Sequence, residues 1–264
     1  MPEGDTVWRT AQRLNRAFAG EPLTRTDLRW PGISTLDFTG ATTLEVASRG
    51  KHLLHRLDSG HTIHSHLRME GQWLIADAAT ARPNAQTRAL LSTARWAALG
   101  QRLGMLDVVR TEDEPTLVGH LGPDLLGADW NASGAVANLA SANTTIGAAL
   151  LDQTNLAGVG TLYAAETLFA ERLNPWTPTA DLTDGQLTHL VDRAHRLLDN
   201  GRRNAVQFDH RQHPARREHL GARPLRTDLP ALRRHRPGGD DRPAHPRADD
   251  VLLPVLPGRP RPER

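Results

Sequence analysis

Apolar residues recur at helical spacing near the start of the chain. They lie three or four positions apart, at Val7, Trp8, Ala11, Leu14 and Phe18. This spacing places side chains on one face of a helix. Asp5 or Thr6 is the expected cap and Gly20 the expected stop. The pattern therefore predicts a helix from about Asp5 to Phe18.

From about Leu23 to Val109 the period changes from helical to alternating. Short segments with strand-like alternation occupy 42–48, 52–58, 61–67 and 72–77. Turn signals such as Asp58-Ser59-Gly60 separate them. This part of the chain predicts an antiparallel sheet that follows one N-terminal helix.

After Gly122-Pro123 the pattern becomes helical again. Four segments fit a period of 3.6 residues, at 131–140, 145–152, 160–172 and 184–200. The chain is therefore expected to be an α+β protein with two lobes, a β-rich N-lobe over about 1–118 and a helical C-lobe over about 123–206. No internal repeat is evident.

The segment 208–264 has a different composition. It holds 13 Arg and 10 Pro, and it lacks Ile, Lys, Ser, Asn, Met, Trp and Tyr. Such a segment buries too little apolar area to offset its ordering entropy, so a disordered C-terminal tail is expected. All of the excess positive charge lies in it, because residues 1–207 carry more acidic than basic side chains. Net charge is therefore weak support for nucleic-acid binding, and a natural basic tail is one interpretation.

Several classes of protein are excluded by composition. No apolar run approaches the roughly 18 residues that span a bilayer, and the N-terminus carries Glu3 and Asp5 in place of an apolar signal core. The chain has no Cys, which excludes disulfides and thiolate metal sites. We expect a cytoplasmic protein without a membrane partner.

The first residues are candidates for covalent chemistry. Removal of Met1 would leave Pro2 as a secondary amine, and an α-amino group titrates near pH 8. Attack of this amine on the anomeric carbon of a sugar gives an iminium that acts as an electron sink. Glu3 would lie beside it and could move protons. The alternative is that Met-Pro-Glu is an ordinary start.

Two further segments carry candidate binding groups. Lys51 is the only lysine among 31 Arg and could bind phosphate or assist elimination; a plain surface lysine is the alternative. Alternation places His64, His66 and Arg68 on one face, and Met69 follows at a turn. A Met at a loop tip can enter a base stack when a nucleotide is flipped out. A His-x-His metal pair is possible there but has no evident third ligand, and core or surface histidines are equally compatible.

A glycine-rich turn separates two predicted helices in the stretch 150–166, LLDQTNLAGVGTLYAAE. The second helix begins near Gly160, and its free backbone amides form an anion site suited to a DNA phosphate. A plain helical hairpin is the alternative.

Together these segments resemble the formamidopyrimidine-DNA glycosylase and endonuclease VIII family over about 1–206. MPEGD, SRGKHL, HLRMEG, LGPDLL and LLDQTNLAGVGTLYAAE occur in that family's order. The resemblance implies a β-sandwich N-lobe, a helix–two-turn–helix C-lobe, and a monomeric bacterial base-excision-repair enzyme acting on damaged double-stranded DNA. It implies DNA glycosylase and AP-lyase activities, with β/δ elimination through a proline Schiff base. The MPEGD start is closer to the endonuclease VIII branch, which implies oxidised pyrimidines as substrates.

The same resemblance assigns roles to particular residues. Pro2 is the nucleophile, Glu3 the proton donor for base removal, and Lys51 assists strand scission and binds phosphate. Met69 fills the gap left by the flipped base with Arg68 beside it. Further DNA contacts are implied at His66, His120, Gly160 and Thr161. Thr161 departs from the family, which usually has Asn at this position.

The C-terminus departs from the family more strongly. The family ends in a zinc-binding β-hairpin finger with two Cys-x-x-Cys pairs, and here no cysteine exists. We expect no metal or cofactor in this chain. However, a one-base shift of the reading frame, with CTG leucine codons, would place cysteines at Leu229, Leu232, Leu253 and Leu256. That is Cys-x2-Cys-x20-Cys-x2-Cys, a zinc signature.

The segment 207–264 is therefore interpreted as a frameshifted remnant of a zinc finger, with the shift close to Gln207. Without zinc-dependent folding of the finger, we expect weak DNA binding and reduced activity on duplex DNA. Two alternatives stay open. One is a non-catalytic nucleic-acid-binding protein, and the other is an active glycosylase with a zinc-free finger.

Overall fold

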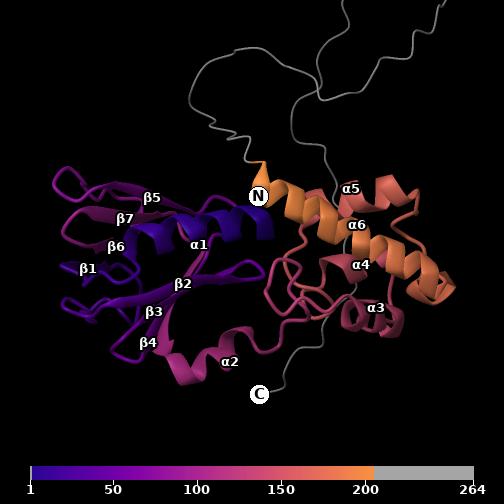
Figure 1. Ribbon diagram of the computed structural model, residues 1–264, viewed down its shortest axis with the longest axis horizontal. Coiled ribbons are helices and arrows are strands. Elements are labelled where there is room, and N and C mark those ends of the chain that lie inside the picture. The colour runs from indigo at the N-terminus through magenta and orange to yellow at the C-terminus, as the bar shows by residue number, and fades with distance from the viewer. Residues whose placement is uncertain (1, 205–264) are drawn as a thin grey trace, which may run out of the picture. The chain divides into compact units, whose positions relative to one another are not determined.

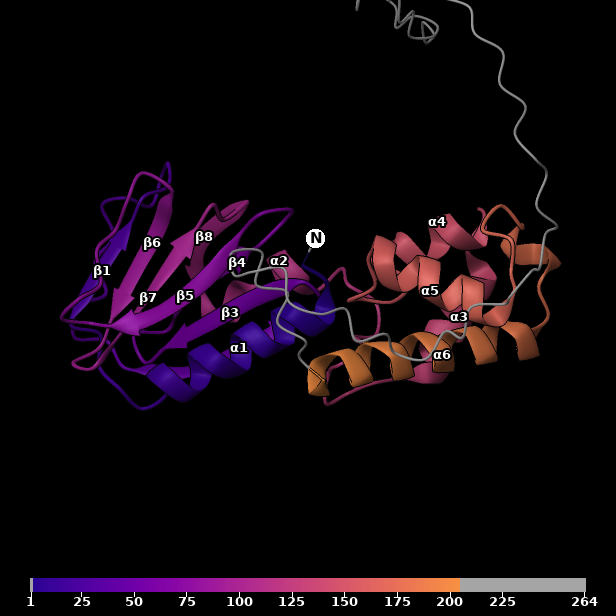
Figure 2. The same cartoon turned by 90° about the horizontal axis from the view of Figure 1, so that it is seen from above.

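Two hydrophobic cores organise the part of the chain that the computed structural model describes, residues 2–204 (Figures 1 and 2). The first core draws on residues between Val7 and Leu106, and the second on residues between Leu125 and Leu198. The predicted disorder and zinc-finger remnant at 207–264 lie outside the described residues.

The first core lies between two antiparallel four-stranded sheets, with orders β1-β6-β7-β5 and β2-β3-β4-β8. Helix α1, Gly4–Phe18, contributes Val7, Ala11, Leu14 and Phe18 to the same core. The strands are β1 Arg25–Leu28, β2 Thr43–Arg49, β3 His52–Leu57, β4 His61–His66, β5 Gln72–Asp77, β6 Thr87–Ser92, β7 Trp96–Gln101 and β8 Met105–Arg110. The predicted N-terminal helix and antiparallel β-sandwich are confirmed.

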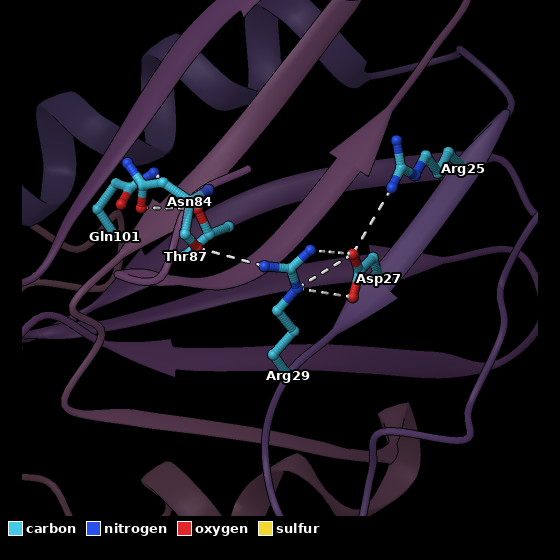
Figure 3. A network of polar contacts seen from close by, with 6 residues as sticks. All are labelled: Arg25, Asp27, Arg29, Asn84, Thr87 and Gln101. Carbon is cyan, nitrogen blue, oxygen red and sulfur yellow. Dashed lines mark hydrogen bonds and ion pairs between the residues drawn. The ribbon is translucent and has the colours of Figure 1, made fainter. Parts of the chain in front are cut away.

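The edge strand β1 is made polar by an ion-pair network, which Figure 3 shows. Arg29 donates to both carboxylate oxygens of Asp27 and to the carbonyl oxygen of Asn84 in the loop before β6. Arg25 flanks the same carboxylate at 3.7 Å, and Asn84 is in turn bonded to Thr87. Charged side chains on an edge strand oppose pairing with another chain.

The second core is helical, as the sequence predicts. Its helices are α3 Ala132–Ser141, α4 Ile146–Leu151, α5 Thr161–Glu171 and α6 Asp184–Arg203, with a short 3-10 turn, η2 Thr179–Asp181. Figure 2 shows α3, α4 and α5 gathered along the long helix α6. A full capping box at Thr183 and Gln186 starts α6. Among residues 2–204, no helix is both long enough and apolar enough to cross a bilayer.

One local prediction is corrected by the structure, and two short elements were not predicted. Helix α1 begins at Gly4 with Glu3 as its N-cap residue, so neither Asp5 nor Thr6 caps it. Asp5 lies inside the first turn, where its carboxylate pairs with Arg9 one turn later, at 2.9 Å. The segment between the sheets and the helical core also contains a 3-10 turn, η1 Thr111–Asp113, and a short helix, α2 Glu114–Val118, which lack a long apolar period in the sequence.

Candidate active site

The carboxylate of Glu3 is held by the N-terminus of helix α5. Its oxygens accept hydrogen bonds from the backbone amides of Gly160 at 2.7 Å, Leu162 at 2.7 Å and Tyr163 at 3.3 Å. The first amides of a helix have no partner within the helix, and the helix dipole favours negative charge there. Glu3 is only 3% exposed. Glu3, which precedes helix α1 of the first core, is therefore hydrogen-bonded to helix α5 of the second core.

This arrangement changes the interpretation of the helix terminus. The sequence predicts a phosphate-binding site at the start of α5, but three of its amides bind Glu3 instead. The sequence could not show this because Glu3 is 157 residues from Gly160. A DNA contact at Gly160 or at the exposed Thr161 stays a prediction.

Two glycines bring the backbones of the two cores together beside Glu3. The amide of Gly4 donates to the carbonyl oxygen of Gly158 at 2.9 Å. A Cβ atom on Gly4 would lie 2.9 Å from the Cα atom of Gly158, so a side chain there cannot be accommodated without a shift. Gly158 itself has φ +108°, a conformation that favours glycine. The turn before α5 thus sets the position of Pro2 and Glu3.

The same turn also meets the lysine segment. Gly50, at φ +56°, donates its amide to Asp124 Oδ2 at 2.8 Å, and a Cβ atom on Gly50 would lie 3.0 Å from Ala157 Cβ. Asp124 also accepts from the amide of Leu126 at 3.0 Å. Burial raises the pKa of the Asp124 carboxyl, and these two amides oppose the shift. Asp124 therefore ties the lysine turn to the helical core, a role that the sequence did not reveal.

Lys51 lies within electrostatic reach of Glu3. Burial lowers the pKa of the Lys51 ammonium, and the negative charge of Glu3 partly opposes that shift. The structure therefore brings the sole lysine toward the residue that follows Pro2, which is itself partly exposed. The segments of two predicted catalytic residues, Glu3 and Lys51, therefore both contact the turn 157–160, and Pro2 is covalently joined to Glu3.

A second polar contact supports the N-terminal end of α1. Asp5 pairs with Arg9 and interacts with the hydroxyl of Tyr163, whose pKa is raised by burial and by Asp5. Arg9 also donates to the carbonyl oxygen of Gly201 near the end of α6. Figure 1 accordingly shows the start of α1 beside that end of α6. The first turn of α1 is therefore bonded to both α5 and α6.

The predicted DNA-contacting residues of the sheet occupy the loop after β4 and its surroundings. Met69 is 67% exposed in the turn 68–70, which suits a side chain that enters a base stack. Arg68 has φ 54°, so the strand alternation ends at His66 and does not extend to Arg68 as the sequence suggested. His120 is exposed after α2. His66 is half-buried, and its pKa is lowered to about 4 by burial first and then by Arg68, His64 and Lys51.

A metal centre is not formed by the described residues. Within 2–204, no group of three or more His, Cys, Asp or Glu side chains is arranged to hold a metal ion. The possible His-x-His pair, His64 and His66, accordingly has no third ligand in this part of the chain. The site that the geometry supports is an amine and carboxylate site.

The fold and the sequence together match one class of enzyme, the DNA glycosylases. The fold is similar to that of Lactococcus lactis formamidopyrimidine DNA glycosylase bound to DNA containing an AP site. The TM-score is 0.69 at 22% sequence identity, over 76% of this chain and 82% of that chain. Family models for the formamidopyrimidine-DNA glycosylase N-terminal domain and H2TH domain match residues 1–108 and 121–213.

Sequence comparison narrows the class to a family. The chain is 47% identical to the probable endonuclease 8 2 of Streptomyces coelicolor, over 78% of this chain and 76% of that protein. It is 44% identical to the DNA-(apurinic or apyrimidinic site) lyase Nei2 of Mycolicibacterium smegmatis, over 75% and 77%. The chain belongs to the formamidopyrimidine-DNA glycosylase and endonuclease VIII family. The predicted enzyme class, a bifunctional DNA glycosylase and AP lyase, is confirmed.

Proposed function

We propose that this enzyme removes oxidised pyrimidines from damaged double-stranded DNA and cleaves the strand through a Schiff base on Pro2. The observation that supports this most is the convergence of the Glu3 and Lys51 segments on the turn at 157–160. The relatives named endonuclease 8 support the branch, and the solved relatives bound to AP-site DNA support the ligand.

In the proposed reaction the Pro2 nitrogen attacks C1′ of the damaged nucleotide. The C1′–N bond to the base breaks, and the base leaves with that electron pair and gains a proton. Opening of the sugar ring gives an iminium at C1′, with the ring oxygen protonated by Glu3. Loss of a C2′ proton then drives β elimination of the 3′ phosphate, and a second elimination releases the 5′ phosphate. Water finally hydrolyses the imine and frees Pro2.

Lys51 is assigned to the phosphate and to the elimination steps. An ammonium of lowered pKa can both bind an anion and exchange a proton, which a guanidinium cannot do. Met69 is assigned to the space left by the flipped nucleotide, with Arg68, His66 and His120 beside it. Gly160 and Thr161 complete the proposed DNA contacts. We place the enzyme in the bacterial cytoplasm with the nucleoid, as a monomer.

Borohydride trapping on DNA with a single abasic site tests the nucleophile directly. The chain has two classes of amine, its terminus and the side chain of Lys51. Mass mapping of the reduced adduct should place the deoxyribose on Pro2. The variant Lys51→Arg should still form that adduct, although more slowly. An adduct on Lys51, or none with any form of the protein, would refute the assignment.

We further propose that the missing zinc finger weakens the enzyme, and that a shift of the reading frame near Gln207 caused its loss. The matched family models end at residue 213. The similarity to the endonuclease 8 2 of Streptomyces coelicolor covers 78% of this chain and 76% of that protein, so part of each sequence has no match in the other. A frame-restored chain should bind zinc and trap abasic duplex DNA at least about tenfold faster than this chain. Equal rates would refute the proposed impairment. Leucine codons other than CTG at two or more of the four positions would refute the frameshift.

A further inference from the structure

Three histidines line the outer face of the sheet β2-β3-β4-β8. Alternate residues of these strands, such as Leu53, Ile63 and Leu106, point into the sandwich core. The residues between them therefore point to the opposite face. On that face His52 is paired with His66 across β3 and β4, and His64 is paired with Asp107 across β4 and β8.

The rings of these histidines are in contact. His52 stacks on His64 with centroids 5.1 Å apart and meets the edge of His66 at 5.0 Å. His52 Nδ1 is hydrogen-bonded to His64 Nε2 at 2.8 Å. His64 is 1% exposed, and its other nitrogen, Nδ1, lies 3.5 Å from a carboxylate oxygen of Asp107. Apart from this long contact, Nδ1 has no hydrogen-bond partner.

The carboxylate of Asp107 favours one direction for this chain of contacts. A carboxylate only accepts hydrogen bonds, so a neutral His64 interacts favourably with Asp107 when it carries its proton on Nδ1. In that tautomer His64 Nε2 is an acceptor, and His52 donates from Nδ1. The remaining nitrogen of His52, Nε2, is then left with a free lone pair. The three residues Asp107, His64 and His52 form a relay that runs from the half-exposed Asp107 side chain to His52, which follows Lys51 in the chain.

His66 has the opposite tautomer. Its Nδ1 accepts the backbone amide of Arg68 at 2.9 Å, so a neutral His66 carries its proton on Nε2. The edge beside Lys51 thus presents a donor from His66 and an acceptor from His52.

The cluster is uncharged at neutral pH. Burial is the main cause that lowers the pKa of His52, to about 3, and it also lowers those of His64 and His66. The surrounding groups include cations and two carboxylates. Lys51, Arg68 and His120 oppose protonation of these rings, whereas Asp107 and Glu114 favour protonation of His64. A phosphate that binds Lys51 or Arg68 would offset the opposing charge.

We propose that the relay of Asp107, His64 and His52 couples binding of a DNA phosphate to uptake of one proton at His52. The proton would add to the free Nε2 of His52, with no bond broken, and Asp107 at the far end would balance its charge through the His52–His64 hydrogen bond and the 3.5 Å contact between His64 and Asp107. Asp107 and His64 are positioning residues, because they set the tautomer of His52 and do not contact the DNA. This inference rests on the proposed function for the identity of the ligand.

The tautomers are tested without DNA by long-range ¹H–¹⁵N NMR of the histidines near pH 7.5. We expect His64 and His52 to carry the proton on Nδ1 and His66 on Nε2. The variant Asp107→Leu removes the acceptor while keeping a similar shape, and it should release His64 and His52 from the Nδ1–H form. A wild-type His64 with its proton on Nε2 overturns the relay, whatever the DNA result.

Proton uptake is tested by fluorescence anisotropy with a duplex that carries a stable abasic analogue, at pH 7.5 and 5.5. If the pKa of His52 returns to about 6.5 in the complex, uptake of one proton strengthens DNA binding about tenfold as the pH falls from 7.5 to 5.5. Asp107→Leu and His64→Phe should reduce the change to about twofold, whereas the control His189→Gln, on the exposed face of α6, should keep it. An unchanged pH dependence in both relay variants refutes the coupling. Failure of both this chain and the frame-restored chain to bind or trap abasic DNA instead refutes the proposed function, and the NMR result then still decides the relay.

Discussion

The contact between Gly4 and Gly158 gives the sharpest test of how the site is assembled. In Gly4→Ala, the new Cβ atom would lie 2.9 Å from Gly158 Cα, 3.0 Å from its carbonyl oxygen and 3.2 Å from Leu198 Cδ2. Ordinary contacts of a Cβ atom begin at 3.4 Å. Because the first two neighbours are backbone atoms, the start of α1 must move outward by roughly half an ångström or more, and Pro2 and Glu3 must move with it.

Gly4→Ala should reduce the rate of adduct formation far more than it reduces the stability of the fold. Overpacking costs about 1–3 kcal/mol, and alanine regains up to about 1 kcal/mol of helix propensity. We therefore expect a loss of about 0–3 kcal/mol in the free energy of unfolding. A displacement near 1 Å costs a catalytic group about 100-fold in rate. Adduct formation should therefore fall about 10- to 100-fold in a protein that is still folded.

The assay is the single-turnover rate of borohydride trapping on abasic DNA with protein in excess, together with urea unfolding of the same samples. Gly185→Ala is the matched control, because the nearest atom to its Cβ is 4.0 Å away and it lies in the first turn of α6. The control should trap at the wild-type rate. If Gly4→Ala traps within threefold of wild type, the two glycines do not position the nucleophile and the reasoning is wrong.

Three other outcomes follow from the site and the core. Burial lowers the pKa of His55 from 6.5 to about 4, so the unfolded chain takes up a proton before the folded one does, and stability falls as the pH drops below 6.5. At about pH 5, His55 alone should lower the free energy of unfolding by about 2 kcal/mol relative to pH 7.5. Equal stability at pH 7.5 and pH 5 in urea unfolding would contradict this prediction. Burial also lowers the pKa of Lys51 from 10.5, so the ammonium loses its charge at a lower pH than a free lysine does. In an alkaline anisotropy titration, the DNA affinity of wild type should therefore fall as the pH rises toward 10.5, whereas that of Lys51→Arg should not. Glu3→Gln should lose release of a damaged base while it still traps a preformed abasic site, because an aldehyde needs no leaving group; equal losses in the two gel assays would argue against a proton-transfer role.

Local pattern was sufficient for most of the secondary structure. Helices at α1, α3, α4, α5 and α6 and strands at β2 to β5 follow from periodicity, because each buries one face against a core. The prediction failed where local signals are weak. Helix α2 has only five residues, and the start of α1 depends on Glu3, whose side chain is satisfied by a distant helix.

The sequence by itself predicted which residues carry the chemistry. Pro2, Glu3 and Lys51 are recognisable because a terminal amine, a neighbouring carboxylate and a sole lysine are chemically distinctive, and their segments resemble a known family. Only the tertiary structure decided that Glu3 occupies the terminus of α5 and that Asp124 anchors Gly50. It also decided that His64 lies between His52 and Asp107. These relations join residues far apart in the chain, and distance in space is set by packing of the two cores, which no local pattern encodes.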